Sequence, residues 1–356
     1  MEVPGLTVPI NASIKEAIAC IDQGQKGIVL VVDEDQKLLA TITDGDIRRA
    51  ILAGHQLDET LSRLIDRTDK SAPSKPVTAR LDAKRTDLLQ LMQEHAIRQI
   101  PLLDADGRVA GLVTLAELMP DQFLPLQAVI MAGGSGTRLR PLTEELPKPM
   151  LPVGDRPLME VIIDQLRQSG IGRVNVTTHY LPEKITNYFG NGENFGVELN
   201  YVSEDRPLGT AGSLGLIDRP EETLLVINGD ILTKVNFRTM LNYHHENEAD
   251  ITVGVRKYEL QVPYGVVECE DHRVCHLKEK PSLSFFVNAG IYMLEPRVIQ
   301  HIPNDQHYDM TDLIERLIQR GGSVISFPIV EYWLDIGEPS DYARAQEDVR
   351  NGGINI

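Results

Sequence analysis

The stretch AVIMAGGSGTRLRPLTEELPKPM, residues 128–150, is the most informative part of the sequence about the fold. An apolar strand leads into a turn that contains three glycines, Gly133, Gly134 and Gly136. Glycine allows the backbone to approach a ligand closely, and the N–H groups of such a turn can point at an anion. Because Arg138 and Lys148 add positive charge, the stretch predicts a loop that binds phosphates.

Common phosphate-enzyme motifs do not describe this loop. A Walker A loop would place Lys-Ser or Lys-Thr after the glycines, and a dinucleotide loop would need a further glycine where Leu139 stands. Kinase motifs are also missing from the sequence. The loop must therefore belong to another class of phosphate-binding protein.

Strand and helix patterns alternate around this loop. Strands are expected at 128–132, 173–180, 197–202, 223–228 and 250–258. Helices are expected at 157–170, 182–190, 210–218 and 237–248. This alternation predicts an α/β domain with a mainly parallel sheet, helices on both faces, and a site at the carboxyl ends of the strands.

The length and composition indicate two globular domains. The chain has 356 residues, of which 42% are hydrophobic, and residues 118–127 read as a linker with two prolines. We expect domains at 1–122 and 127–350. The net charge of −17 argues against a nucleic-acid partner.

Targeting and redox features are few. The start MEVPGLTVPINASIK lacks the pattern of a signal peptide, and no run approaches 18 apolar residues. Three scattered cysteines, Cys20, Cys269 and Cys275, do not form a disulfide framework. We therefore expect a cytoplasmic protein without a membrane partner.

The region before the loop contains an internal repeat. The stretch VVDEDQKLLATITDGDIRRAI, residues 31–51, aligns without a gap with LLDADGRVAGLVTLAELMP, residues 102–120, at a shift of 71 residues. Each unit, at about 6–62 and 76–120, reads as α-β-β-α. A single unit is too small to cover its own sheet, so the two should pack together as an α+β module.

This repeat resembles a CBS-domain pair, a regulatory module, most closely in TITDGDIRR. The resemblance implies an adenine or guanine nucleotide held by Thr43 and Asp46, and by Thr114 and Glu117 in the second unit. Alternatively, these residues only cap the helix that follows each of them. CBS pairs commonly associate, so the resemblance also implies a homo-oligomer.

The second domain resembles the sugar-1-phosphate nucleotidyltransferases, and among them the mannose-1-phosphate guanylyltransferases. GGSGTRLRPLT followed by PKPMLPV carries the resemblance. It continues in order through PLGTAGSL (207–214), VINGDIL (226–232), YGVVE (264–268), KEKP (278–281), VNAGIYML (287–294) and WLDIGEP (333–339). The implied fold is a Rossmann-like, mainly parallel sheet of the GT-A type.

The resemblance implies that a sugar 1-phosphate attacks the α-phosphorus of a nucleoside triphosphate, with Mg²⁺ as cofactor. Asp230 and Asp335 would hold the metal, and Arg138 and Lys148 would neutralise the phosphates. The nucleotide-binding residues would be Ala132, Gly133, Gly134, Gly136, Thr137, Arg138, Glu204, Gly209 and Thr210. The sugar-phosphate-binding residues would be Gly229, Glu279, Lys280, Asn288 and Gly290.

Simpler roles stay open for these residues: turn capping for the aspartates, surface salt bridges for Arg138 and Lys148, and turn formation for Asn288. PLGTAGSL resembles the guanylyltransferase version of this loop more than the uridylyl- or thymidylyltransferase versions, and this resemblance favours GTP. A uridylyl- or thymidylyltransferase and a non-catalytic nucleotide-sugar sensor remain alternatives. The sugar could be a mannose, a heptose or an amino-hexose 1-phosphate, within nucleotide-sugar biosynthesis for cell-surface polysaccharides.

Two clusters of histidine and cysteine are candidates for other sites. CEDHRVCH, residues 269–276, has two Cys and two His, but EDHR reads as a hairpin turn, so the four side chains should not converge on zinc. His244 and His245 lie on a polar helical pattern and are expected to be solvated. Neither cluster is therefore expected to be catalytic.

Overall fold

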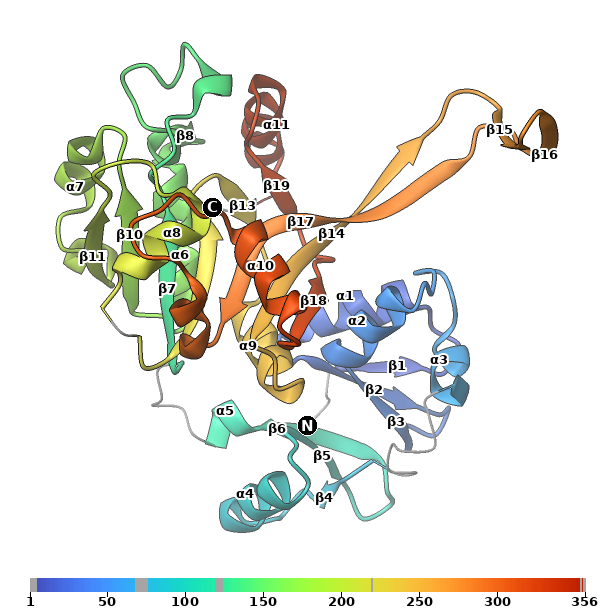
Figure 1. Ribbon diagram of the computed structural model, residues 1–356. Helices are drawn as coiled ribbons and strands as arrows, with labels where there is room; N and C mark the ends of the chain where they lie inside the picture. The colour runs from blue at the N-terminus through green and yellow to red at the C-terminus, as the bar shows by residue number, and fades with distance from the viewer. Residues whose placement is uncertain (1–4, 68–75, 119–123, 219, 353, 355–356) are drawn as a thin grey trace. The chain divides into compact units, whose positions relative to one another are not determined.

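The computed structural model describes residues 5–67, 76–118, 124–218, 220–352 and 354. The chain divides into two compact units, Met1–Gln122 and Phe123–Ile356 (Figure 1). The predicted linker at 118–127 falls largely on residues 119–123, which lie outside the described residues. Among the residues that are described, no helix is long and apolar enough to cross a membrane.

The first unit consists of two α-β-β-α repeats. The first repeat comprises α1 (Ile14–Gly24), β2 (Ile28–Val32), β3 (Leu38–Thr43) and α2 (Asp44–Leu52). The second comprises α4 (Arg85–Glu94), β5 (Gln99–Leu103), β6 (Val109–Thr114) and α5 (Leu115–Leu118). A short parallel strand, β1 (Thr7–Pro9) or β4 (Ala79–Arg80), is added to each sheet, and α3 (Leu61–Arg67) follows the first repeat.

The turns between the paired strands show that the repeat is structural. Asp33 Oδ1 accepts hydrogen bonds from the N–H groups of Asp35 and Lys37, at 2.9 and 2.8 Å. Asp104 Oδ1 accepts the equivalent bonds, also at 2.9 and 2.8 Å, from two residues of its own turn. A short aspartate side chain thus closes the same turn twice.

The second unit is built on a seven-stranded sheet, which confirms the predicted fold class. Its order is β11-β10-β7-β12-β17-β14-β18. The strands in this order are Glu198–Ser203, Arg173–Thr178, Leu126–Met131, Thr223–Asn228, Ser282–Leu294, Ile251–Gln261 and Val324–Pro328. Only β17 runs antiparallel to its neighbours, so the sheet is mixed but mainly parallel.

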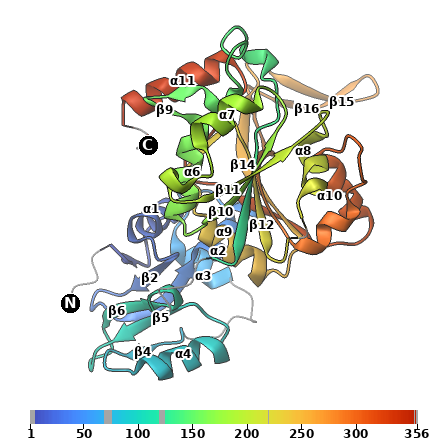
Figure 2. The ribbon, with the colours of Figure 1, turned by 90° about the vertical axis from the view of Figure 1, so that its left-hand side faces the viewer.

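Helices cover both faces of this sheet. Figure 2 shows α6 (Leu158–Gln168) and α7 (Pro182–Phe189) on one side, and α8 (Gly209–Gly212) and α10 (Met310–Gln319) on the other. Because strand side chains alternate, Leu225 and Ile227 of β12 join one apolar core, while Leu224 and Val226 join the second. The sheet is therefore buried on both faces, as a parallel sheet requires.

Smaller elements complete the unit. These are η1 (Thr137–Leu139), η2 (Lys148–Met150), β8 (Pro152–Val153), β9 (Arg156–Pro157), η3 (Glu193–Phe195), η4 (Ser213–Leu216), β13 (Ile231–Thr233), α9 (Phe237–Glu246), β15 (Val266–Glu270), β16 (Arg273–Lys278), η5 (Pro296–His301), β19 (Trp333–Asp335) and α11 (Pro339–Arg350). The helix expected at 210–218 is wrong as a single element, since α8 and η4 replace it. Its two glycines weaken a regular helix.

Candidate active site

The glycine loop follows β7, at the carboxyl end of the strand. Gly136 has a φ of 60°, and a Cβ atom there would lie 2.9 Å from Thr143 Cγ2. The buried Thr143 hydroxyl donates a 2.7 Å hydrogen bond to the Gly136 carbonyl oxygen, so it fixes this backbone shape. Gly134 is exposed with open space where a side chain would be, which suits close approach of a ligand.

Asp230 and Asp335 are brought together by pairing of two short strands. Asp230 follows β12, and β13 pairs with β19 so that Ile231 lies opposite Asp335. The Ile336 N–H donates a 3.0 Å hydrogen bond to the Asp230 carbonyl oxygen. Two carboxylates that are far apart in the sequence therefore lie close together, just beyond the carboxyl end of β12.

Lys148 and Arg138 supply positive charge to these carboxylates. The largely buried Lys148 Nζ forms an ion pair with Asp230 Oδ2. A Cβ atom on Gly337 would lie 3.5 Å from Asp335 Oδ1 and 3.7 Å from an Arg138 guanidinium nitrogen. Both predicted cations therefore lie beside the predicted metal-binding pair.

The electrostatics of Asp335 reflect this crowding. The pKa of Asp335 is raised to about 6, mainly by loss of surrounding water and then by the nearby charge of Asp230, while Lys148 and Arg138 act in the lowering direction. The residue keeps an exposed part despite this desolvation. A bound cation would stabilise the ionised form of Asp335 beside the negative charge of Asp230.

The oxygen atoms at this position fit a hard cation. Asp230 Oδ1 and Asn228 Oδ1 are buried and have no hydrogen-bond partner among the residues that the structure describes. Within those residues no group of three or more His, Cys, Asp or Glu side chains could hold a metal. Asp230 and Asp335 would hold Mg²⁺ together with phosphate oxygens of the substrates, since this ion takes few ligands from protein.

Glu204 lies against the glycine loop, and Gly209 and Thr210 follow it in the chain at the start of α8. Glu204 is buried, which raises its pKa, and its Oε2 accepts a 2.9 Å hydrogen bond from the Leu208 N–H. A Cβ on Gly133 would lie 2.8 Å from Glu204 Oε1. Ala132 is buried and Thr137 is exposed at the start of η1.

Gly229 follows β12, and Asn288 and Gly290 lie in the neighbouring strand β17. The Gly229 N–H donates a 2.9 Å hydrogen bond to the Met131 carbonyl oxygen, which ties β12 to β7. Gly290 has a φ of 69°, and a Cβ there would lie 2.6 Å from Asn228 Nδ2. Asn288 Oδ1 accepts a 3.0 Å bond from the Gly290 N–H, within β17 and beside a shift in its register with β14, so Asn288 lies in a strand and not in a separate turn.

Glu279 and Lys280 are not brought to the other site residues. They lie between β16 and β17, on a ribbon that extends away from β13 and β19 (Figure 1). Both residues are exposed, and Lys280 has a φ of 43°. Their contact with a sugar phosphate therefore stays a prediction that this arrangement does not support directly.

Three further residues line the site without having been singled out from the sequence. Asn228 ends the apolar strand β12, and Asp309 Oδ1 accepts a 3.1 Å bond from the Thr210 N–H at the start of α8. Burial raises the pKa of Tyr292, which is close to Asn288, to about 12. A polar residue at the end of an apolar strand was the available signal for Asn228.

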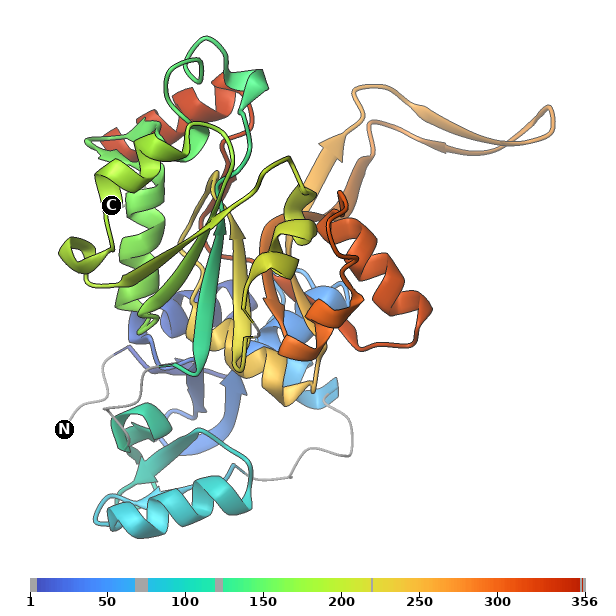
Figure 3. The ribbon, with the colours of Figure 1, turned by 60° about the vertical axis from the view of Figure 1, so that its left-hand side comes forward.

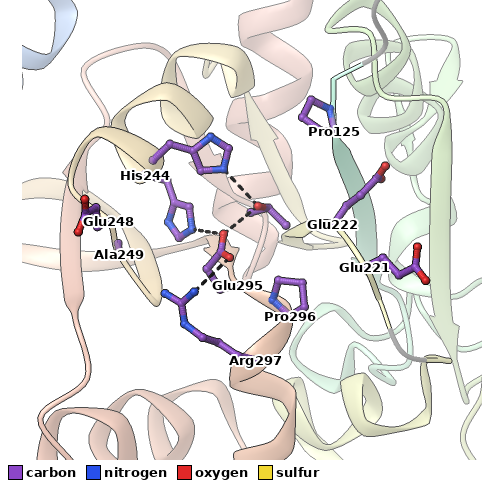
Figure 4. Close-up of a pocket in the computed structure, with 11 residues that line it drawn as sticks. Pro125, Glu221, Glu222, His244, Glu248, Ala249, Glu295, Pro296 and Arg297 are labelled. Atoms are coloured by element: carbon purple, nitrogen blue, oxygen red, sulfur yellow. Dashed lines mark hydrogen bonds and ion pairs between the residues drawn. The ribbon is translucent and has the colours of Figure 1, made fainter. Parts of the chain in front are cut away.

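A separate pocket of about 800 Å³ lies at the amino end of β12, beside its first residue, Thr223 (Figure 4). His244 is fully buried there, so the expectation that it is solvated is wrong. Its ring nitrogens contact Thr252 Oγ1 at 2.7 Å and Glu295 Oε1 at 3.2 Å. Because both ring nitrogens have partners, His244 can be buried at no cost in unpaired polar atoms, and its role is structural.

The CEDHRVCH segment forms the hairpin β15–β16, with the turn at Asp271 and His272. Glu268 lies opposite His276, whereas Cys269 lies opposite Val274. Cys269 and Cys275 are both exposed free thiols. The hairpin was correctly predicted from the sequence.

The Thr and acidic residues of both CBS-like units cap helices. The Thr43 hydroxyl accepts from the Asp46 N–H at 3.2 Å, and Asp46 Oδ2 accepts from the Thr43 N–H at 2.8 Å. Thr114 and Glu117 make the same reciprocal pair, at 3.3 and 2.8 Å. Glu117 also forms an ion pair with Lys26 of the first repeat.

The second unit places a glycine loop, carboxylates and cations at the carboxyl edge of a mainly parallel sheet, which is the arrangement of a phosphate-handling α/β enzyme. The family model described as nucleotidyl transferase matches residues 127–352, and the CBS domain model matches residues 1–53 and 70–120. The chain belongs to the nucleotidyl transferase family and carries a CBS-domain pair.

Similar proteins act on several nucleotides. A UTP–glucose-1-phosphate uridylyltransferase from Synechocystis sp. is 36% identical over 241 residues, covering 62% of this chain and 62% of that protein. A D-glycero-alpha-D-manno-heptose 1-phosphate guanylyltransferase from Aneurinibacillus thermoaerophilus is 34% identical over 231 residues, covering 64% of this chain and 99% of that protein. The chain thus spans less than two thirds of the length of the uridylyltransferase.

Among solved structures, one from Bacillus anthracis is described as a glucose-1-phosphate thymidylyltransferase. It has a TM-score of 0.52 and 26% identity, and the match covers 65% of this chain and 97% of that one. The match supports the fold of the second unit. These three relatives are named as uridylyl-, guanylyl- and thymidylyltransferases, so their names involve three different bases.

Proposed function

We propose that the protein transfers a nucleotidyl group from a nucleoside triphosphate to a sugar 1-phosphate. The observation that carries the proposal is the pairing of β13 with β19, which places Asp335 beside Asp230 and its partner Lys148. A phosphate oxygen of the sugar forms a bond to the α-phosphorus, and the bond from that phosphorus to the pyrophosphate oxygen breaks. No nucleophilic side chain is needed, because the attacking oxygen belongs to the substrate.

The side chains position the substrates and neutralise their charge. Exposed Arg138, with its planar guanidinium group, binds the leaving pyrophosphate, while Lys148 binds the reacting phosphates. The loop at Gly133, Gly134 and Gly136 donates backbone N–H groups to the triphosphate. Holding both substrates in line contributes much of the rate, because this chemistry depends on positioning.

Bound Mg²⁺ would lower the barrier by withdrawing negative charge from the phosphate oxygens. Asp230 would hold the cation, since its Oδ1 has no hydrogen-bond partner in the described structure. Ionised Asp335 would be the second carboxylate of the site. Lys148 already balances the second oxygen of Asp230.

GTP is the triphosphate that we propose. PLGTAGSL, at 207–214, is most like the guanylyltransferase version of this loop, and a guanylyltransferase relative shares 34% identity. The loop places Gly209 and Thr210 at the start of α8, where the Thr210 N–H donates to Asp309 Oδ1. A uridylyl- or thymidylyltransferase is the alternative, because relatives with those names are also similar.

For the CBS pair we propose a regulatory nucleotide, adenine or guanine, at Thr43 and Asp46. The family match and the partly solvent-accessible positions of Thr43 and Asp46 support this role. Ligand binding would have to compete with the caps, because Asp46 Oδ2 already accepts two hydrogen bonds from Thr43. The whole chain would act in the cytoplasm, in nucleotide-sugar biosynthesis that supplies cell-surface polysaccharides.

The test is a pyrophosphate-release screen of four nucleoside triphosphates against mannose, heptose, glucose and amino-hexose 1-phosphates, with Mg²⁺. We expect the highest kcat/KM with GTP and one of the manno-configured or amino sugars. Preference for UTP or TTP would overturn the assignment of the base alone. Nucleotide-sugar binding without release in any pair would instead favour a sensor.

A further inference from the structure

A short loop after β10 contacts two different parts of the candidate active site. Residues 179–181 connect the end of β10 to the start of α7. Leu181 has a φ of 46° and a ψ of 51°, a left-handed conformation that is unfavourable for a residue with a side chain. Backbone of this kind persists where its neighbours hold it in place, and it is common at functional sites. The contacts of the loop therefore need an explanation.

His179 contacts the segment that leads to the PLGTAGSL loop. Its Nδ1 lies 2.8 Å from the carbonyl oxygen of Glu204 and donates to it, because a carbonyl oxygen can only accept. The Glu204 N–H donates a 2.9 Å hydrogen bond to the Thr178 carbonyl oxygen. The loop is thus fixed to the residue whose carboxylate lies against Gly133.

Tyr180 contacts the segment between the two predicted phosphate-binding cations, Arg138 and Lys148. Its hydroxyl lies 3.1 Å from the carbonyl oxygen of Thr143 and 3.0 Å from that of Glu144. One O–H group is therefore shared between two backbone acceptors. Since the hydroxyl is directed at the protein, Tyr180 acts on this segment and not on a substrate.

The segment that Tyr180 contacts, residues 140–147, has little packing of its own. Residues 140–142, 144 and 145 are exposed, and Leu146 is only partly buried against the core. Figure 3 shows this part of the chain, in green, as a loop beyond the carboxyl end of β7. A segment with few buried contacts opens easily unless it is anchored. Tyr180 provides an anchor from a different strand.

Thr143 transmits this anchor to Lys148. Thr143 is fully buried, and its hydroxyl donates to the Gly136 carbonyl oxygen at 2.7 Å. A Cβ atom on Gly136 would lie 2.9 Å from Thr143 Cγ2 and 3.2 Å from Lys148 Cβ. Thr143 and Lys148 therefore pack on the same glycine, so a shift of Thr143 disturbs the position of Lys148 beside Asp230.

We propose that Tyr180 is a positioning residue for nucleotidyl transfer, which holds residues 140–147 so that Lys148 faces the reacting phosphates. The inference rests on the proposed function, because Lys148 neutralises phosphates only in that reaction. Transfer of this kind depends on orientation, and a small displacement of a charged group slows it strongly. Loss of the Tyr180 hydroxyl should therefore affect turnover more than it affects stability.

The first test compares Tyr180→Phe with a matched control, Tyr201→Phe, in the full chain. The Tyr201 hydroxyl also donates to a backbone carbonyl, that of Gly190, at 2.8 Å, so both variants lose the same kind of bond. Pyrophosphate release is measured with the triphosphate and sugar 1-phosphate that react fastest in the substrate screen. The Tm of each variant shows whether the two lose similar stability.

We expect kcat of Tyr180→Phe to fall about tenfold, while KM for the sugar 1-phosphate changes by less than about twofold. Tyr201→Phe should keep both constants within about twofold of wild type. Equal losses of kcat in the two variants would overturn the inference, because a general loss of stability would then explain both.

A double variant tests whether Tyr180 acts through Lys148. Lys148→Arg keeps the positive charge but changes its geometry. Because the two residues act on one contact, Tyr180→Phe/Lys148→Arg should lose less kcat than the product of the two single losses. A loss equal to that product would contradict action through Lys148.

Hydrogen–deuterium exchange follows the segment itself, without substrate. Peptides from residues 137–148 should exchange faster in Tyr180→Phe than in wild type or Tyr201→Phe, because local opening becomes easier. Unchanged exchange in an active enzyme would overturn the inference about Tyr180 alone. A wild-type chain that releases no pyrophosphate with any substrate pair would overturn the proposed function, and the inference with it.

Discussion

Lys148 and Asp230 form an ion pair across the site, with Lys148 Nζ on Asp230 Oδ2. The other oxygen of Asp230 is buried without a hydrogen-bond partner in the part of the chain that the structure describes. The carboxylate is therefore held by one cation and open to another. Incoming phosphates would compete for Lys148, and this competition would release charge on Asp230 for a metal.

Asp230→Asn should remove transfer activity while the fold persists. The amide keeps the size of the side chain but cannot balance a cation, so kcat/KM should fall by about 10²-fold or more. Pyrophosphate release measures the loss, and circular dichroism measures the fold. Asp164→Asn, which removes a partner of Arg167 on α6, is the control and should keep its activity. Full turnover by Asp230→Asn would contradict the metal assignment.

Asp335 should make Mg²⁺ binding dependent on pH. Its pKa of about 6 means that the carboxyl group is protonated below that pH, so affinity for Mg²⁺ should fall by about tenfold per pH unit there. Calorimetric titration with Mg²⁺ between pH 5 and pH 8 measures the affinity. Arg138→Met removes a charge that lowers this pKa, and should move the midpoint to higher pH.

The same shift has a defined effect on stability. The native carboxyl group titrates near 6, whereas its ordinary value is 3.8, so the native state binds more protons between these values. The free energy of unfolding should therefore decrease as the pH rises from about 4 to 6. Asp335→Asn should lack this contribution, which denaturant unfolding at each pH can measure. An identical pH profile for wild type and variant would contradict the raised pKa.

Helices, strands and turns could be predicted from the sequence better than the distances between residues far apart in the chain. Strands such as 223–228 have continuous apolar runs, and the Asp-x-Asp turns of the repeat have a local cause, so both could be found from neighbours along the chain. The family motif identified Asp230 and Asp335. Their proximity depends on the pairing of β13 with β19, which no local pattern encodes.

The parts that could not be predicted depend on tertiary context. Gly212 and Gly215 interrupt the helix expected at 210–218. The burial of His244 on α9 depends on Thr252 of β14 and on Glu295, which follows β17. The position of Lys280 depends on how far β14 and β17 extend as a ribbon. Periodicity describes one element at a time and cannot report such contacts.

Gly209→Ala should destabilise the second unit. Gly209 has a φ of 79°, and the new Cβ would lie 2.6 Å from Asp309 Oδ1 and 2.7 Å from the Tyr308 carbonyl oxygen. We expect a loss on the order of 2 kcal/mol in the free energy of unfolding, from the strained backbone and the clash. Gly215→Ala is the matched control, because its Cβ would make an ordinary contact of 3.6 Å with Ile302. Equal stability of the two variants would contradict the close packing at Gly209.

Thr43→Ala separates capping from nucleotide binding in the CBS pair. Loss of the cap on α2 should cost about 1 kcal/mol of unfolding free energy, whether or not a ligand binds. Ser13→Ala removes an equivalent capping box from α1, where no nucleotide is expected, and should cost a similar amount. Calorimetric titration of each full-length variant with AMP, ATP and GTP then distinguishes the roles. Binding that is lost in Thr43→Ala but kept in Ser13→Ala supports a nucleotide site, whereas a wild-type chain that binds none of the three shows that Thr43 and Asp46 act as a cap alone.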